Sequence, residues 1–188
     1  MRPVTKITTG LVLVFGAFRL EGFDLLLDPV GWGLCAAGLL GLRYRDDDSF
    51  GRAAYCAAAM LCLSIVATVT STADPGHLRT VSLIVQVIGL AAAAGSLVTV
   101  WLVTDAVIGR VHAGGDTSRA ALLDVLRWAV TGLGALGTAA GYGYADLGAV
   151  ISVACFAAGV VLIAVLYRSA RLPYLSAEWE PVADWCFS

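Results

Sequence analysis

Three acidic side chains and one arginine interrupt the first apolar stretch of the chain, and they are well placed to do chemistry. Residues 18–43 (FRLEGFDLLLDPVGWGLCAAGLLGLR) contain Arg19, Glu21, Asp24 and Asp28. On a continuous helix the three carboxylates are spaced i, i+3, i+7 and share one face. They could bind a cation, or one could stay protonated because desolvation disfavours its charged form. Glu21 and Asp24 are therefore candidate catalytic acids, and Arg19 is a candidate binding residue.

Structural roles would also account for these residues. Asp28 precedes Pro29, and an aspartate before a proline is a favourable start for a helix, so we expect Asp28 to be an N-cap. Arg19 could form a simple ion pair with Glu21 or Asp24. It lies ~20 Å along the helix axis from the start of the span, at 1.5 Å per residue. That position is below the outer boundary of a ~30 Å hydrocarbon core, so the arginine needs a partner.

The composition places these residues in a membrane protein. Of 188 residues, 59% are hydrophobic and 14% are charged, whereas soluble domains carry about 25% charged residues. A soluble core cannot absorb so many apolar side chains without large exposed patches. Alanine, glycine, valine and leucine predominate without ten-residue alternation, which indicates helices rather than a membrane barrel. The sequence therefore predicts an all-α fold that crosses a bilayer several times.

Six apolar segments are candidates for membrane spans, each judged against the roughly 17–25 residues that a crossing needs. The second is short enough to be tilted or re-entrant, and the fourth is long enough to tilt or to project from the bilayer. The six segments are residues 4–27, 29–42, 50–71, 78–108, 120–142 and 147–167.

The distribution of basic residues predicts the orientation of these spans. With a cytoplasmic N-terminus, ten of the twelve Lys and Arg residues fall inside, and only Arg19 and Arg79 fall on the outer half. Eleven of the twelve are arginine, in a chain rich in Ala and Gly, which is typical of a GC-rich bacterium. We therefore expect a six-helix transmembrane bundle in a bacterial inner membrane, with both termini cytoplasmic. The first span is expected to be uncleaved.

The chain divides into a transmembrane domain, residues 1–171, and a cytoplasmic tail, residues 172–188. The tail is rich in acidic and aromatic residues (LPYLSAEWEPVADWCFS), so it could fold onto the inner surface or dock on a partner. A disordered terminus is the alternative.

Other polar residues within the spans are candidates for binding. Gln86, in the fourth span, could share a depth with Arg19 and contribute a buried amide to one polar pocket, although hydrogen bonding between helices also explains it. Asp105 lies well inside the apolar stretch of the same span, and we expect it to pair with Arg110. Asp124 and Arg127 are spaced i, i+3 and are expected to form an ion pair.

Small residues in the fifth span favour close helix packing. The segment contains the GxxxG pair Gly137 and Gly141, which allows two helices to approach closely. The glycines could pack within the chain or form an interface with another chain.

Several kinds of site are not indicated. The five cysteines include no CxxC pair, and His77 and His112 lie in different loops, so we expect no metal and no cofactor. P-loop, GxSxG and HExxH motifs are absent, as is a basic nucleic-acid patch. The acidic run at residues 46–48 is interpreted as a cap of the third span on a solvated loop.

A segment of the chain resembles one that recurs in other proteins. Residues 23–42, FDLLLDPVGWGLCAAGLLGL, contain the pattern FDLLxD-x-x-G-aromatic. They resemble a segment of small bacterial, actinobacterial-like polytopic membrane proteins of unassigned function. The resemblance implies an integral membrane protein and transfers no active site.

Three functional hypotheses follow. The first is a small membrane protein without enzymatic activity, either an accessory subunit bound to a partner membrane protein or a permease for a small solute or ion. The second is an intramembrane enzyme that uses a protonated Glu21 or Asp24 as general acid on a lipophilic, isoprenoid-like molecule, as a membrane terpene cyclase would. The third is a sensor or immunity-type protein that acts through its inner tail.

Overall fold

The chain is all-helical in the part that the structure describes. The computed structural model describes residues 3–17, 24–42, 49–72, 80–140 and 145–169, and within these ranges it contains six helices and no strand. The helices are α1 (Pro3–Ala17), α2 (Asp24–Leu40), α3 (Ser49–Thr72), α4 (Thr80–Ala113), α5 (Thr117–Ala140) and α6 (Ala145–Ser169). The predicted helical class is therefore confirmed.

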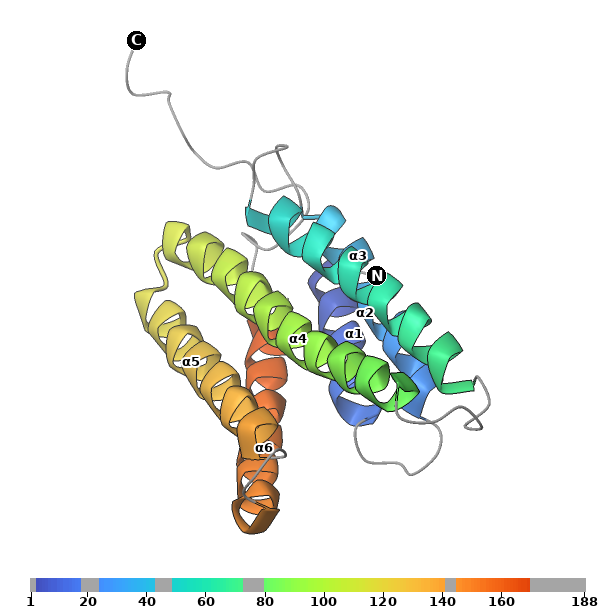
Figure 1. Ribbon diagram of the computed structural model, residues 1–188. Helices are drawn as coiled ribbons and strands as arrows, with labels where there is room; N and C mark the ends of the chain where they lie inside the picture. The colour runs from blue at the N-terminus through green and yellow to red at the C-terminus, as the bar shows by residue number, and fades with distance from the viewer. Residues whose placement is uncertain (1–2, 18–23, 43–48, 73–79, 141–144, 170–188) are drawn as a thin grey trace.

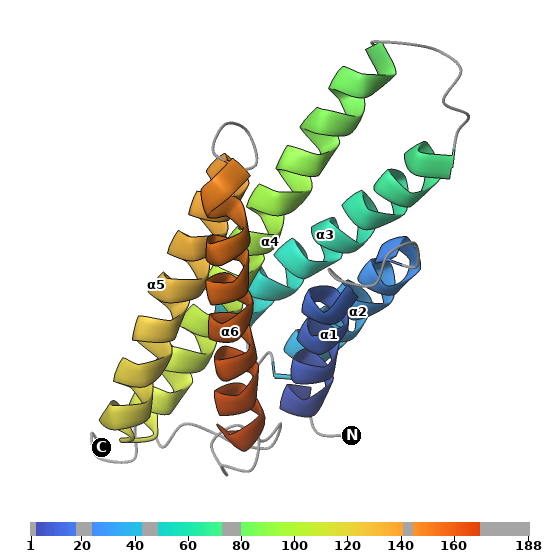
Figure 2. The same cartoon turned by 90° about the horizontal axis from the view of Figure 1, so that it is seen from below.

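Each helix packs against the next one in the chain, and α1 also contacts α6 (Figures 1 and 2). The turn between α4 and α5 shows how the sequence directs this arrangement. Gly115 adopts a positive φ of 84°, a conformation that glycine tolerates and that commonly ends helices. Asp116 then accepts a hydrogen bond from the backbone N–H of Arg119 at 3.1 Å, which caps the first turn of α5.

The α1–α2 pair is held together at glycines where the two backbones come close. A Cβ added to Gly10 would lie 2.5 Å from the carbonyl oxygen of Gly31, and one added to Gly38 would lie 2.6 Å from a side-chain carbon of Ile7. The Cys35 thiol donates to the carbonyl of Ile7 at 3.4 Å. These small residues let the two helices touch along their length.

Burial in α3–α6 is concentrated at one end of the bundle. Nearly all buried residues of these four helices lie in residues 50–60, 99–111, 120–130 and 159–169, which we call the base. The α4–α5 turn lies at this end of the molecule (Figure 2). The opposite end, residues 61–69, 86–98, 131–139 and 150–158, contains no buried residue among those described. Its exposed side chains include Ile65, Val87, Leu90, Leu136 and Phe156.

Three helical segments are long and apolar enough to cross a membrane. They are Ser49–Val69, Gln86–Ala113 and Thr117–Ala140, with mean hydropathies of 1.7, 2.0 and 1.3. The shorter segments Pro3–Phe15 and Val153–Ser169 are also apolar. An apolar surrounding explains why so many large aliphatic side chains lie exposed on this chain. The helices are therefore suited to a bilayer.

The start of the chain departs from the predicted first span. A continuous helix over residues 4–27 is wrong, because α1 ends at Ala17 and α2 begins at Asp24. Asp28 and Pro29 consequently lie inside α2, so the prediction that Asp28 caps a helix is also wrong. Asp24 is itself a residue type that favours helix starts. Pro29 then removes one intrahelical hydrogen bond near that start, which α2 tolerates.

Candidate functional site

The acidic cluster predicted near the first span lies mostly outside the described residues. This holds for Arg19 and Glu21, and Asp24 is described only as the first residue of α2, without its side chain. Their grouping into a catalytic or binding site stays a prediction. The predicted acidic cap of the third span at residues 46–48 and the tail at residues 172–188 also lie outside the described residues.

Gln86 lies on the first turns of α4, where its side chain is exposed. It is therefore not the buried amide that the predicted polar pocket required. Whether it shares a depth with Arg19 stays a prediction.

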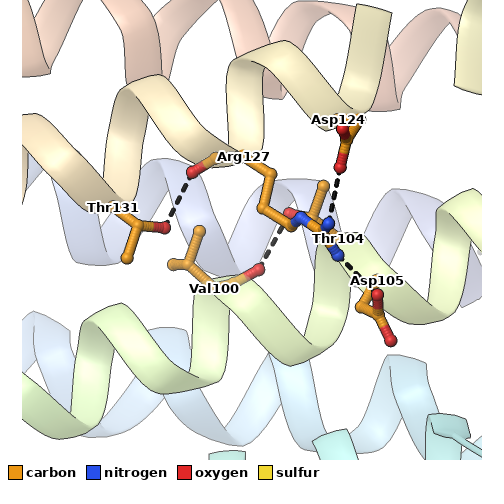
Figure 3. Close-up of polar contacts among 6 residues, drawn as sticks. All are labelled: Val100, Thr104, Asp105, Asp124, Arg127 and Thr131. Carbon is orange, nitrogen blue, oxygen red and sulfur yellow. Dashed lines mark hydrogen bonds and ion pairs between the residues drawn. The ribbon is translucent and has the colours of Figure 1, made fainter. Parts of the chain in front are cut away.

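A charged cluster joins α4 to α5 at the base. Arg127 of α5 lies between two carboxylates: its Nη1 is 2.5 Å from Oδ1 of Asp105 on α4, and its Nη2 is 2.5 Å from Oδ1 of Asp124 on its own helix (Figure 3). One guanidinium thus binds both acids in a forked arrangement that arginine geometry allows. The predicted pair of Asp124 and Arg127 is confirmed.

Two tryptophans complete the surroundings of Arg127. The guanidinium carbon lies 4.0 Å from the centroid of the Trp101 ring, a cation–π distance. Trp101 in turn meets Trp128 edge-to-face, with ring centroids 4.7 Å apart. Stacking on Trp101 keeps the Arg127 side chain largely buried, with 14% of its surface exposed. Its Nε is buried without a hydrogen-bond partner among the described residues.

Hydroxyl groups next to the cluster do not extend it. Thr104 donates to the carbonyl of Val100 at 2.8 Å, and Thr131 donates to the carbonyl of Arg127 at 2.7 Å (Figure 3). Each hydroxyl thus bonds to a carbonyl of its own helix, as threonine hydroxyls in membrane helices commonly do. The cluster is therefore limited to its three charged groups and the tryptophans.

The predicted pairing of Asp105 with Arg110 is wrong. The spacing i, i+5 turns the two side chains to different sides of α4, so Asp105 meets α5 instead. Arg110 donates to the carbonyl of Leu42, just beyond α2, at 3.1 Å and covers the ring of Phe50 on α3 at 4.5 Å. Each residue thus connects α4 to a different neighbour. The short α4–α5 turn is the signal that could have paired Asp105 with Arg127, since the two lie at similar distances from it.

The glycines of α5 point in different directions. A Cβ on Gly134 would lie 2.5 Å from a methyl carbon of Leu97 on α4, and one on Gly137 would lie 3.5 Å from Ile151 on α6. Gly137 therefore contributes to packing within the chain, whereas Gly141 lies outside the described residues. Gly132 is exposed, and a Cβ there would meet nothing within 4 Å.

The chemistry of the cluster is that of charge recognition and helix pairing. Two carboxylates share one guanidinium, and the described residues hold no group of three or more metal-ligating side chains. Both acids are half-exposed, with 52% of the Asp105 side chain and 47% of the Asp124 side chain accessible. The cluster can therefore tie α4 to α5 and still present negative charge to a neighbour.

Comparison with protein-family models, with curated proteins and with solved structures found no match. The resemblance of residues 23–42 to small bacterial membrane proteins therefore stays a prediction.

Proposed function

We propose that the chain is an accessory subunit of a bacterial inner membrane, a six-span protein with cytoplasmic termini that binds another membrane protein laterally. The three segments suited to crossing a bilayer support the membrane placement. The base of the bundle would face the cytoplasm, because Arg52, Arg110, Arg127 and Arg168 lie there.

The observation that carries the proposal is an exposed face of α5. Its members are exposed and repeat with the alternating 3- and 4-residue spacing by which one helix packs along another. We call it the α5 face, and it consists of Val125, Trp128, Gly132, Ala135 and Ala139. The last three are small, so they leave room for a second helix to approach closely.

The remaining glycines of α5 show that this face is separate from the internal packing. Gly134 meets Leu97 and Gly137 meets Ile151, so they point towards α4 and α6. Gly132 points into open space. The chain thus satisfies its own packing with one set of small residues and leaves a second set free for a neighbour.

The uncharged helical segments give less support to a permease for ions or polar solutes. The helical segments 53–72, 80–104, 128–140 and 147–167 contain no acidic or basic residue. Their hydroxyl groups largely bond within their own helices, as Thr68 does to Ser64 and Thr138 does to Gly134. A polar solute would find few free partners along these segments.

A pair of matched variants tests the proposal. Gly132→Leu fills the α5 face, whereas Gly89→Leu places the same side chain at an exposed glycine of α4 that also has open space. We expect the wild-type protein, purified from its host membrane in a mild detergent, to migrate with a stoichiometric membrane partner. Gly132→Leu should release the free chain, and Gly89→Leu should not. A wild-type chain that is free of partners, or equal behaviour of the two variants, would contradict the proposal.

A further inference from the structure

The arginines at and next to the base divide into two groups according to their contacts. Arg110, Arg119 and Arg127 each have a partner within the chain, which is a backbone carbonyl, one aspartate and two aspartates respectively. Arg52 and Arg168 are exposed, and neither side chain forms an ion pair or a hydrogen bond within the part of the chain that the structure describes. These two guanidinium groups are therefore available to a ligand outside the chain.

Arg52 and Arg168 occupy corresponding positions on α3 and α6. Each is the first charged residue at the base end of an uncharged helical segment, residues 53–72 in α3 and residues 147–167 in α6. At 1.5 Å per residue each segment extends about 30 Å, the thickness of a hydrocarbon core. The side chain of an arginine that follows such a segment can extend to the lipid headgroups. The proposed orientation of the base makes these the headgroups of the cytoplasmic leaflet.

An exposed tyrosine accompanies each of the two arginines. Tyr55 follows Arg52 at i+3, on the same side of α3, and 64% of its surface is exposed. Tyr167 directly precedes Arg168 and is 53% exposed. Tyrosine collects where hydrocarbon meets the headgroups, because its ring is apolar and its hydroxyl is polar. The tyrosines therefore support a position of both arginines at the lipid headgroups.

The charges along the sequence favour an anion at Arg168 over one at Arg52. No acidic residue occurs in residues 147–177, and Arg171 adds a second positive charge close to Arg168. Arg52, by contrast, follows the acidic run at residues 46–48. Attraction of an anion should therefore be stronger at the end of α6 than at the start of α3.

We propose that Arg168, and more weakly Arg52, bind the phosphate groups of anionic phospholipids in the cytoplasmic leaflet. A guanidinium donates two parallel hydrogen bonds to phosphate oxygens. The acyl chains of the same lipid would cover exposed apolar residues such as Val161, which lies two turns from Arg168 on the same side of α6. A zwitterionic lipid carries its own ammonium group, so an unpaired arginine favours a lipid with net negative charge.

Binding of single lipids to the full-length protein tests the inference. The protein in a mild detergent is titrated with phosphatidylglycerol or with phosphatidylcholine of identical acyl chains, and native mass spectrometry counts the lipids bound. We expect the wild-type protein to bind its first phosphatidylglycerol about fivefold more tightly than phosphatidylcholine. Arg168→Gln should remove most of this preference, and Arg52→Gln should remove a smaller part.

Arg119→Gln is the matched control, because it removes the same charge from an exposed arginine that already pairs with Asp116. It should leave the preference for phosphatidylglycerol unchanged. Binding of phosphatidylcholine should be the same in all variants, and circular dichroism checks that their helices remain.

Three results would overturn the inference. Equal affinity of the wild-type protein for the two lipids would show that both arginines are simply hydrated. An equal loss of preference in Arg168→Gln and Arg119→Gln would show a response to net charge. Displacement of phosphatidylglycerol by inorganic phosphate at constant ionic strength would show a site for a soluble anion.

The inference uses the proposed membrane placement but not the proposed partner. Each of these three results would leave the lateral association standing if Gly132→Leu still released the natural partner, so the two failures are distinguishable.

Discussion

The contact between α1 and α2 depends on glycine at position 10, and the substitution Gly10→Ala tests it. The added Cβ would lie 2.5 Å from the Gly31 carbonyl oxygen, 2.7 Å from the Cys35 sulfur and 2.9 Å from the Cys35 nitrogen. Two of these three atoms are backbone, so no rotamer change can relieve the overlap. The helices must separate by about 1 Å, and such overpacking costs about 1–3 kcal/mol. The gain in helix propensity from alanine, about 0.5–1 kcal/mol, offsets part of this cost.

We therefore expect Gly10→Ala to lower the free energy of unfolding by about 1–2 kcal/mol. Gly33 of α2 is the matched control, because a Cβ there would meet nothing within 4 Å. Gly33→Ala should leave stability unchanged or raise it by up to about 1 kcal/mol. Unfolding is followed by circular dichroism as sodium dodecyl sulfate replaces a mild detergent. If Gly10→Ala were as stable as Gly33→Ala, the backbone contact between α1 and α2 would be refuted.

Two further predictions concern the base and the adjacent α4–α5 turn, and they use the same unfolding measurement. Arg127→Gln leaves Asp105 and Asp124 without their shared cation and should cost about 1–2 kcal/mol, less than for a fully buried pair because the acids are half-exposed. Arg119→Gln removes an exposed ion pair with Asp116 and should lower the free energy of unfolding by less than about 0.5 kcal/mol. Equal losses of stability in Arg127→Gln and Arg119→Gln would contradict the account. Asp116→Ala removes the cap of α5 and should cost about 1 kcal/mol, whereas Asp116→Asn keeps a side-chain acceptor and should cost little. Identical stability of the two Asp116 variants would show that the cap is unimportant.

Periodic and compositional signals were sufficient to predict the main features of the fold. Long apolar runs separated by short polar turns predicted six helices in nearly the observed positions, from α3 to α6 within a few residues. The spacing of Asp124 and Arg127 on one helix predicted their contact. Both signals act locally along the chain, so a single sequence contains them.

Features that depend on how two helices meet were not predicted. The end of α1 at Ala17 was missed because Arg19, Glu21 and Asp24 were interpreted as charges within one span rather than as the boundary between two helices. The partner of Asp105 lies on α5, and only the register of the α4–α5 pair selects Arg127 over Arg110. The close approach at Gly10 needed the relative rotation of α1 and α2, which no spacing within one helix gives.

The central claim is that the helices cross a bilayer with the α5 face exposed to its interior, and the surroundings of Ala135 test it most directly. Ala135 is an exposed member of that face near the middle of the uncharged segment 128–140. A spin label on Ala135→Cys, in a variant without the five native cysteines, is measured in reconstituted bilayers against oxygen and a polar nickel complex. We expect frequent collisions with oxygen and few with nickel, as for a site in the hydrocarbon core. Frequent collisions with nickel and few with oxygen would place the α5 face in water and contradict the account.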